Sequence, residues 1–527
     1  MKTLYNAKIY TMNPALPVAS TIVVEEGRVV AVGGPDLKNK LSDKSDLQDM
    51  HGSIILPGLT DAHMHLEHFA FSQQQVFCET DTLEQCLKNV ADKAASLPKG
   101  AWIQGWGWNQ NVWAGGYGTA EDLDRVAPEN PVYMSSKSGH ATWANSLAMK
   151  LASVDSSTPD PEGGVIQRDN TGKPTGIFFE TANDLVRQII PPATVEDSAR
   201  AIIAAQPALW AMGLTGVHDF NNVRCFSALQ RLNLDDELKL RVTKGIPLDF
   251  ARHAAAVGLR SGFGSEFLRI GSVKLFADGA LGSQTAGMLE PLENLPGSTG
   301  IMLIDAETMF EHGKIAVKSG LSLAIHAIGD RANRVVLDGL QLLREYEREH
   351  AISGLKHRIE HAQLLHPDDI SRLSALKITG SMQPIHTTSD MDISDKYWGA
   401  RSAGAFVFKT LLELGTELIF GSDAPVETPN PFFGLHAAVT RRRANGYPTP
   451  DGWHHEQKIT LYQALQGFTT APAAANGGFE RSGTLKQGNN ADLIALDVDP
   501  FNIDPQDLYL IKPISTMVAG EWVYQAN

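Results

Sequence analysis

Cysteine, signal-peptide features and long apolar runs are scarce or absent in this 527-residue chain. It has three cysteines, none in a Cys-x-x-Cys pair or a nucleophile motif, and their odd number suits a reducing compartment. No run reaches the roughly 18 apolar residues of a membrane-spanning helix, and the first residues lack the apolar core of a signal peptide. We therefore expect a cytoplasmic protein without a membrane partner.

The chain also has fewer basic than acidic residues. Lysine and arginine total 45 against 60 aspartates and glutamates, which gives a net charge of −15. Because nucleic-acid binding needs clustered positive charge, this balance argues against a nucleic-acid partner. The one basic run, residues 441–443, is short, and we interpret it as an exposed helix face.

The length and a hydrophobic content of 43% allow a large core and two or three domains. Short strand patterns fill residues 1–56 and 480–527, so we expect one β-sandwich domain built from both ends of the chain. Residues 57–69 and 191–479 carry the pattern of a barrel. Residues 70–190 lack that rhythm, and we predict that they form an α/β insertion after the first barrel strand, over the active site.

Strands and helices alternate from about residue 191 onward, which is typical of a parallel sheet. Eight strand–helix units favour a (β/α)₈ barrel of the TIM type over a doubly wound sheet. Counting the strand that ends at residues 63–65 as the first, the other predicted strands are 215–219, 240–246, 270–278, 321–326, 356–361, 378–383 and 417–423.

Polar residues with metal-binding chemistry stand at the ends of these strands. His63 and His65 are two residues apart, so on a strand both imidazoles face the same side. The later strands end in Lys274, His326, His361 and Asp423. Each residue alone has an ordinary alternative, such as a core histidine or a helix cap. Because the carboxyl ends of barrel strands converge on one face, the whole set indicates a metal site.

The chemistry of this set is coherent. Imidazole and carboxylate are good ligands for Zn²⁺ and similar divalent ions. A lysine ammonium would repel a metal ion, but a Lys274 side chain carboxylated by CO₂ becomes an anionic ligand that can bridge two ions. Two ions can lower the pKa of a shared water and polarise a carbonyl oxygen. Asp423 can then act as general base and return the proton to a leaving nitrogen.

Several motifs resemble those of the amidohydrolase superfamily, and more narrowly amidohydrolase family 3, whose activities include N-substituted formamide deformylase. They are residues 56–65, 273–283, 326–333, 358–361 and 421–425, with His140 and 143–146 matching an insertion motif. The resemblance implies hydrolysis of a non-peptide C–N bond of a small molecule by a metal-bound hydroxide on two metal ions. Gln284 departs from the pattern, because many relatives have arginine there.

Two alternatives stay open. A mononuclear aminohydrolase acting on a heterocyclic ring shares the fold, but that subgroup usually has a glutamate three residues after the fifth-strand histidine. Here that position is Gly329, and Lys274 is present, so both residues favour the dinuclear interpretation. A non-catalytic scaffold or regulator typically loses metal ligands, and this chain keeps all six.

The sequence says less about the substrate. Tryptophans in the insertion predict either an aromatic-lined lid for an apolar amide or simply the core of that insertion. The candidate substrate contacts are Trp106, His140, Asp278 and Gln284. A homodimer is the default expectation for the assembly.

Overall fold

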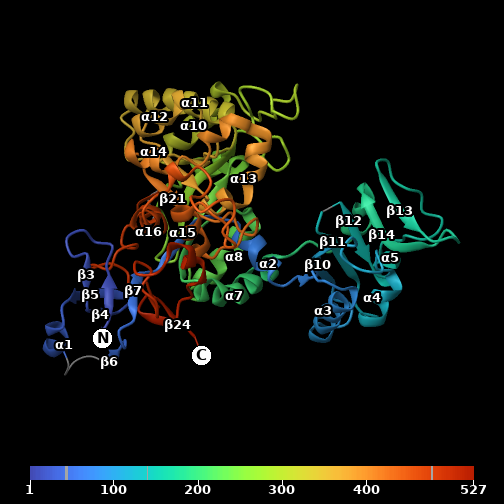
Figure 1. Ribbon diagram of the computed structural model, residues 1–527, viewed down its shortest axis with the longest axis horizontal. Helices are drawn as coiled ribbons and strands as arrows, with labels where there is room; N and C mark the ends of the chain where they lie inside the picture. Colours follow the sequence, from blue (N-terminus) through green and yellow to red (C-terminus); the bar gives the residue numbers. More distant parts are fainter. Residues whose placement is uncertain (42–45, 139, 476–478, 527) are drawn as a thin grey trace. The chain divides into compact units, whose positions relative to one another are not determined.

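The computed structural model describes residues 1–41, 46–138, 140–475 and 479–526. The chain divides into two compact units, one of residues 1–70 and 195–527 and the other of residues 71–194. The first unit holds an eight-stranded sheet and two terminal sheets, and the second holds a six-stranded sheet (Figure 1).

The eight-stranded sheet is parallel throughout and is ordered β21-β20-β19-β18-β17-β16-β15-β8. Its strands are β8 (Leu59–Met64), β15 (Leu214–Asp219), β16 (Arg241–Pro247), β17 (Leu268–Phe276), β18 (Leu323–Ala327), β19 (Arg358–His361), β20 (Thr379–Met382) and β21 (Leu418–Phe420). Each corresponds to a strand predicted from the sequence. Most positions along these strands are buried, as expected for a parallel sheet covered on both faces. The (β/α)₈ prediction is confirmed.

The barrel is nearly closed, because β8 and the segment that follows β21, the two ends of the sheet, are joined by backbone contacts. Met64 and Ala424 form a parallel bridge. The amide of Asp423 donates to the carbonyl of His63 at 2.7 Å. Gly421 permits this approach, because a Cβ at that position would lie 2.4 Å from the backbone nitrogen of His63.

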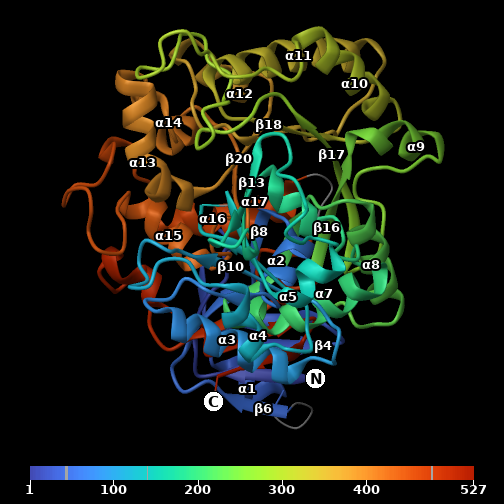
Figure 2. The same cartoon turned by 90° about the vertical axis from the view of Figure 1, so that its right-hand side faces the viewer.

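Helices follow the barrel strands and cover the sheet. They include α7 (Val195–Ala211), α8 (Val223–Leu234), α10 (Ala306–Lys318), α11 (Asp330–Glu349), α12 (Pro367–Ala375), α13 (Pro384–Trp398), α14 (Phe408–Glu413), α15 (Pro431–Thr440) and α16 (Leu461–Phe468). Val336, Leu340 and Leu343 of α11 are fully buried, as their helical spacing predicts. In Figure 2, α10, α11 and α12 form a layer outside β17, β18 and β20.

Strands from both ends of the chain share one sheet, ordered β24-β23-β22-β7-β2-β3, and a second sheet is ordered β5-β4-β1-β6. β7 (Ile54–Pro57) pairs antiparallel with β22 (Leu493–Leu496), which joins the N-terminal and C-terminal segments directly. The others are β1 (Lys2–Tyr5), β2 (Lys8–Tyr10), β3 (Val18–Ala19), β4 (Thr21–Glu25), β5 (Arg28–Gly33), β6 (Asp46–Asp49), β23 (Ser515–Val518) and β24 (Glu521–Gln525). Extra sheets from both termini are therefore part of the fold, as predicted.

The second unit is built on a sheet ordered β13-β14-β12-β11-β10-β9. Its elements are β9 (Val76–Phe77), α3 (Leu83–Ser96), β10 (Ile103–Trp108), α4 (Ala120–Val126), β11 (Val132–Ser136), β12 (Ala141–Ala144), α5 (Ser146–Leu151), β13 (Gly164–Arg168) and β14 (Pro174–Glu180). Trp108, Trp113 and Trp143 are buried together in its core. For these three tryptophans the packing interpretation holds, whereas Trp106 is 40% exposed.

The run of three arginines is not an exposed helix face. Arg441 is fully buried at the end of α15, with a left-handed backbone (φ 54°). Its guanidinium donates to the carbonyl of Trp453 at 2.6 Å and to that of Phe406 at 2.9 Å. Burial lowers the pKa of Arg441 to about 9. The exposed-face interpretation is wrong for Arg441, because α15 ends at Thr440 and backbone carbonyls, which leave no mark in the sequence, accept hydrogen bonds from the buried guanidinium.

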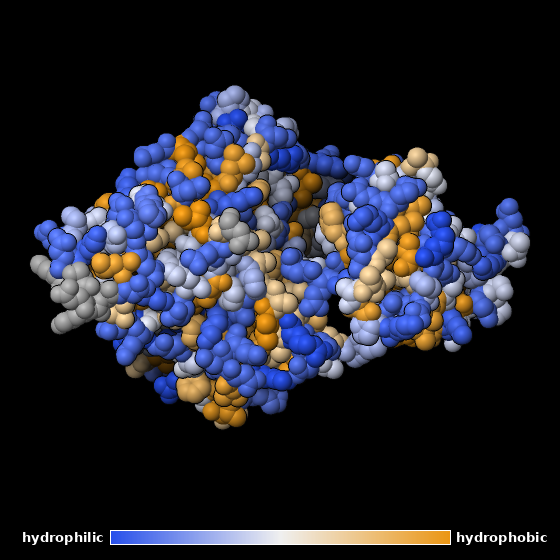
Figure 3. Space-filling view, turned by 90° about the horizontal axis from the view of Figure 1, so that it is seen from below, coloured by the Kyte–Doolittle hydropathy of each residue, from blue (hydrophilic) through white to orange (hydrophobic). Residues whose placement is uncertain are grey.

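Hydrophilic side chains predominate on the molecular face in Figure 3, and apolar side chains form separate patches between them. Among the helices that the structure describes, none combines the length and apolar character needed to cross a bilayer.

Candidate active site

Two histidines at the end of β8 face a carboxylate that follows β21. The side chain of His63 is 1% exposed, and its Nε2 lies 3.6 Å from Asp423 Oδ1. His65, the more exposed of the two, places its Nε2 3.3 Å from the same oxygen. Asp423 has a left-handed backbone (φ 60°), an uncommon conformation for a non-glycine residue. The backbone pairing that closes the barrel therefore brings both histidines to this carboxylate.

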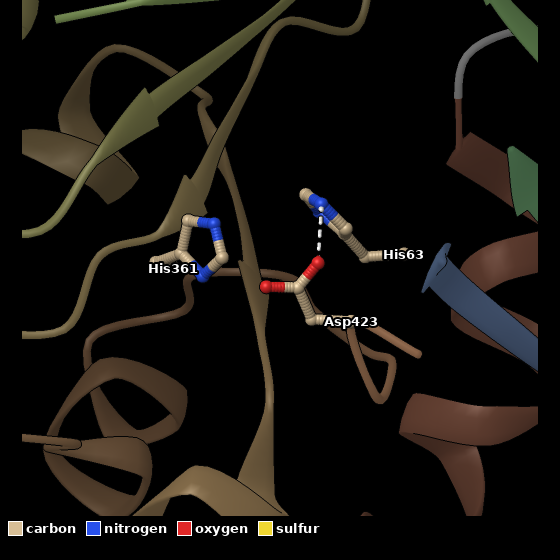
Figure 4. Close-up of side chains that lie close together, drawn as sticks. All are labelled: His63, His361 and Asp423. Carbon is tan, nitrogen blue, oxygen red and sulfur yellow. Dashed lines mark ion pairs between the residues drawn. The ribbon is translucent and has the colours of Figure 1, made fainter. Parts of the chain in front are cut away.

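The histidines of β18 and β19 join the same cluster. The ring of His361 lies 5.0 Å from that of His63 and 4.5 Å from that of His326. Three potential metal-ligand atoms, one each from His63, His361 and Asp423, lie within 4.8 Å of one another. Figure 4 shows the three side chains converging. His361 Nδ1 is buried and has no hydrogen-bond partner among the described residues.

Lys274 points from β17 into the same region. The residue is only 5% exposed, and its Nζ lies over the rings of Phe220 and Phe276, 4.7 Å and 5.0 Å from their centroids. Among the described residues, no carboxylate oxygen lies within 4.0 Å of Nζ, and Nζ makes no hydrogen bond. Burial lowers the pKa of this amine to about 8.

The protonation states in this cluster suit a cation. Burial lowers the pKa of His63 and of His326 to about 4, and it holds that of His361 well below the usual range. Burial alone would raise the pKa of Asp423, but a hydrogen bond from His65 and the neighbouring imidazoles outweigh it and keep that pKa well below normal. At neutral pH His63, His326 and His361 are therefore neutral and Asp423 is ionised, which are the forms that bind metal.

The buried ion pair of Glu360 and Arg358 orients the His63 ring through its Nδ1. Glu360 Oε2 lies 2.5 Å from His63 Nδ1, and its other oxygen pairs with Arg358. Arg358 also contacts His218 Nδ1 at 2.8 Å and donates to the carbonyl of Ala62 at 3.0 Å. Burial would raise the pKa of Glu360, but Arg358 and His63 hold it well below normal. A carboxylate on Nδ1 fixes the ring so that Nε2 faces Asp423.

Asp61 ties the first strand to the segment that carries Asp423. Its carboxylate accepts from the amides of His63 at 3.0 Å and Ser422 at 3.1 Å, and from the Ser422 hydroxyl at 2.5 Å. Burial raises the pKa of Asp61 to about 7. Asp61 therefore links the backbone of His63 to the residue that precedes Asp423.

Asp278 is placed as a loop anchor. Its side chain is fully buried, and its carboxylate accepts from the amides of Gly287, Ile328 and Gly329 at 2.8–3.0 Å. Burial raises its pKa to about 7. Oδ1 lies 3.5 Å from His326 Nε2, so Asp278 contacts a residue of the cluster. The carboxylate has no exposed surface, and contact of Asp278 with a substrate stays a prediction.

The other predicted substrate contacts lie apart from these groups in the chain. Gln284 is half-buried in the loop after β17, where its amide donates to the carbonyl of Leu281 at 2.9 Å. Trp106 and His140 belong to the second unit. There Trp106 packs edge-on against Phe77, and His140 lies 3.1 Å from Glu180. Contact of Gln284, Trp106 or His140 with a substrate stays a prediction.

One residue of the cluster is missing from the sequence prediction. His386, in the first turn of α13, is only 8% exposed, and its ring is parallel to that of His361 at 6.2 Å. His386 Nε2 is buried and finds no hydrogen-bond partner among the described residues. His386 does not belong to the strand-end pattern, because the predicted strand ends at Gln383 and His386 lies three residues beyond it. Pro384 is a sequence signal for this position, because proline is favoured at the start of a helix and places His386 in the first turn after the strand.

Comparison with known proteins identifies the family. Residues 46–524 match the sequence model of the amidohydrolase family. The chain belongs to this family. It is 31% identical to the putative amidohydrolase YtcJ of Bacillus subtilis (strain 168), with 100% of each chain covered. It is 27% identical to the N-substituted formamide deformylase of Arthrobacter pascens over 99% of this chain and 98% of that protein. The resemblance deduced from the motifs is confirmed.

A solved structure agrees with this family assignment. An uncharacterized metal-dependent hydrolase from Pyrococcus furiosus superposes on this amidohydrolase with a TM-score of 0.78 and 29% sequence identity. The match covers 95% of this chain and 100% of that one. The similarity therefore extends beyond the barrel to nearly the whole chain.

Proposed function

We propose that this metal-dependent hydrolase of the amidohydrolase family cleaves an amide or related C–N bond of a small molecule, other than a peptide bond, with Asp423 as general base. The observation that carries the proposal is the buried cluster in which His63 and His361 converge on Asp423 (Figure 4). Membership of the family and the likeness to a metal-dependent hydrolase support it.

The proposal includes two divalent metal ions, with Zn²⁺ as the best chemical match to imidazole and carboxylate donors. The proposed ligands are His63, His65, Lys274 in carboxylated form, His326, His361 and Asp423. The buried Nδ1 of His361 lacks a partner among the described residues, as expected of a site built for an ion. When bound, such ions supply water of lowered pKa and polarise a carbonyl oxygen.

The residues themselves have separate tasks in the proposed reaction. Asp423 is ionised at neutral pH, so it can accept a proton from water and deliver it to the leaving nitrogen. His65, the more exposed of the two β8 histidines, positions that carboxylate, with its Nε2 3.3 Å from Asp423 Oδ1. Glu360 fixes the His63 ring, and Asp61 holds the backbone that carries both sides of the cluster.

The structure weighs against the aminohydrolase alternative. A glutamate at position 329 would take the place of Gly329, where a Cβ would lie 2.0 Å from the carbonyl oxygen of Gly287. Backbone atoms cannot yield to such a contact without moving the loop that Asp278 anchors. The proton shuttle typical of that subgroup therefore has no room at this position, which favours an amide substrate over a ring amine.

A substrate screen tests the proposal. The zinc-loaded protein should hydrolyse at least one compound among N-formyl amines, N-acyl amino acids and cyclic amides, with N-substituted formamides tested first because a relative bears that name. Turnover should disappear after complete removal of metal and return with Zn²⁺. Full activity in a metal-free preparation would contradict the proposal, and deamination of heterocyclic amines alone would favour the aminohydrolase.

His386 is expected to contact the substrate. Its buried Nε2, which has no hydrogen-bond partner among the described residues, is suited to bind a polar atom of the substrate. His386→Ala should therefore raise KM about tenfold, the effect of one lost hydrogen bond, while metal content stays at the wild-type value. His350→Ala, at the exposed end of α11, is the matched control. A fall in bound metal would instead identify His386 as a ligand and contradict this prediction.

A further inference from the structure

Two of the three cysteines face each other inside the second unit. Cys78 follows β9, Cys86 lies in the first turn of α3, and both are completely buried. Their Sγ atoms are 2.6 Å apart. Because a disulfide bond measures about 2.04 Å, a shift of roughly half an ångström would bring the two sulfurs to bonding distance. Cys225 lies in the other unit, where its Sγ is 3.5 Å from Asp219 Oδ2.

The backbone on both sides holds the sulfurs in this arrangement. The amide of Cys78 donates to the carbonyl of Trp106 at 2.8 Å, which fixes it to the edge of the sheet. The connection to α3 is held by Trp113, whose Nε1 donates to the carbonyl of Thr80 at 3.0 Å. The α3 helix is capped by Thr82. The pair is therefore positioned by elements packed around a common core rather than by a chance side-chain rotation.

We propose that Cys78 and Cys86 form a reversible disulfide, a redox modification site of the insertion. A small-molecule disulfide such as glutathione disulfide is the oxidant. One cysteine thiolate attacks a sulfur of the oxidant, which releases one reduced glutathione and leaves a mixed disulfide on the protein. The second thiolate then attacks that protein sulfur, forms the Cys78–Cys86 bond and releases the second reduced glutathione. The two thiol protons pass to the two glutathione thiolates.

The surroundings determine the rates of the two steps. The hydrogen bond to Cys86, together with burial, raises the pKa of the Cys78 thiol, so the thiolate is scarce at neutral pH. The first step therefore needs a local opening of the two-residue strand β9 and should be slow. The second step should be fast because the sulfurs already lie side by side. A reducing compartment would keep both thiols free, and the bond would form when the thiol poise becomes oxidising.

Peptide mapping of the full-length, natively folded protein tests the proposal. The folded protein is incubated with excess glutathione disulfide and then unfolded in denaturant with N-ethylmaleimide, which blocks every free thiol, and it is cut after glutamate. Cleavage after Glu79 and Glu84 separates the two cysteines, so their peptides stay joined only by a disulfide. We expect a joined pair whose mass is two hydrogens below the sum of the free peptides, and separate peptides after reduction.

Three variants and one further measurement sharpen the result. Cys225→Ala should form the joined pair as wild type does, whereas Cys86→Ser and Cys78→Ser should not. In the wild-type protein, hydrogen exchange in β9 and the first turn of α3 should slow after oxidation and recover with reductant, which needs no variant to fold. Separate N-ethylmaleimide adducts on both cysteines, or a stable glutathione adduct without the internal bond, would overturn the proposal.

Discussion

Asp423→Asn is expected to lower turnover by about 10²–10⁴-fold, the usual effect of losing a general base. The asparagine keeps the shape of the side chain and the backbone pairing of Asp423 with His63, so the barrel should stay closed. It cannot accept a proton from water, and it removes the negative charge that His65 and His63 face at 3.3 Å and 3.6 Å. Asp423→Ala should be about as damaging.

Steady-state kinetics on the best substrate of the screen, together with metal content by mass spectrometry, measure this effect. Asp392→Asn on α13 is the matched control, because Asp392 is half-exposed and pairs with Arg443 rather than with the cluster. The control should keep wild-type rates. An Asp423→Asn protein with near wild-type turnover and full metal content would show that the proton is accepted by another group.

The barrel and the polar residues that converge at its strand ends can be predicted from the sequence for one physical reason. A parallel strand buried on both faces is a short apolar run, and its carboxyl end lies at the catalytic face of the barrel. The polar residues that end such runs, His326 and His361 among them, must therefore approach one another, as the 4.5 Å between their rings shows. Local pattern and global geometry agree at these positions.

The residues that support the cluster were not readable in the same way. Glu360 lies beside His361 in a motif recognised from the sequence, but its contact with His63 joins positions 297 residues apart. Alternation along β19 puts Arg358 and Glu360 on one face, yet only the assembled sheet shows what that face meets. Asp61 is similar, because its partner Ser422 is 361 residues away.

Composition was least informative for the insertion. Its tryptophans are compatible both with a lid and with a core, since a buried indole and a ligand-binding indole have the same sequence signature. The packing of Trp108, Trp113 and Trp143 into one cluster shows how these three are used. The Cys78–Cys86 contact could not be predicted from the sequence either. Three cysteines are as compatible with three separate thiols as with one close pair and a single thiol.

Lys274→Ala is expected to lose at least one metal ion and most of the activity. The Lys274 amine is buried, stands over two aromatic rings and makes no ion pair with any described carboxylate, so a fixed positive charge there would oppose a cation beside His63. With its pKa lowered to about 8, a substantial fraction is the neutral amine at mildly alkaline pH. The neutral amine is the form that reacts with CO₂, and the product is an anionic ligand.

Metal stoichiometry and reconstitution provide the measurement for Lys274. Metal-stripped wild-type protein should recover two ions and full activity faster with added bicarbonate, and more so as the pH rises toward 8, because the fraction of free amine grows in that direction. Lys274→Ala should show no response to bicarbonate, but short-chain carboxylic acids should partly restore its metal binding by occupying the vacated space. Lys274→Arg is the matched variant, since its guanidinium keeps the positive charge and stays protonated. A fully active wild-type protein with one bound ion and a free Lys274 amine would decide against the dinuclear site and leave a mononuclear hydrolase on the same ligands.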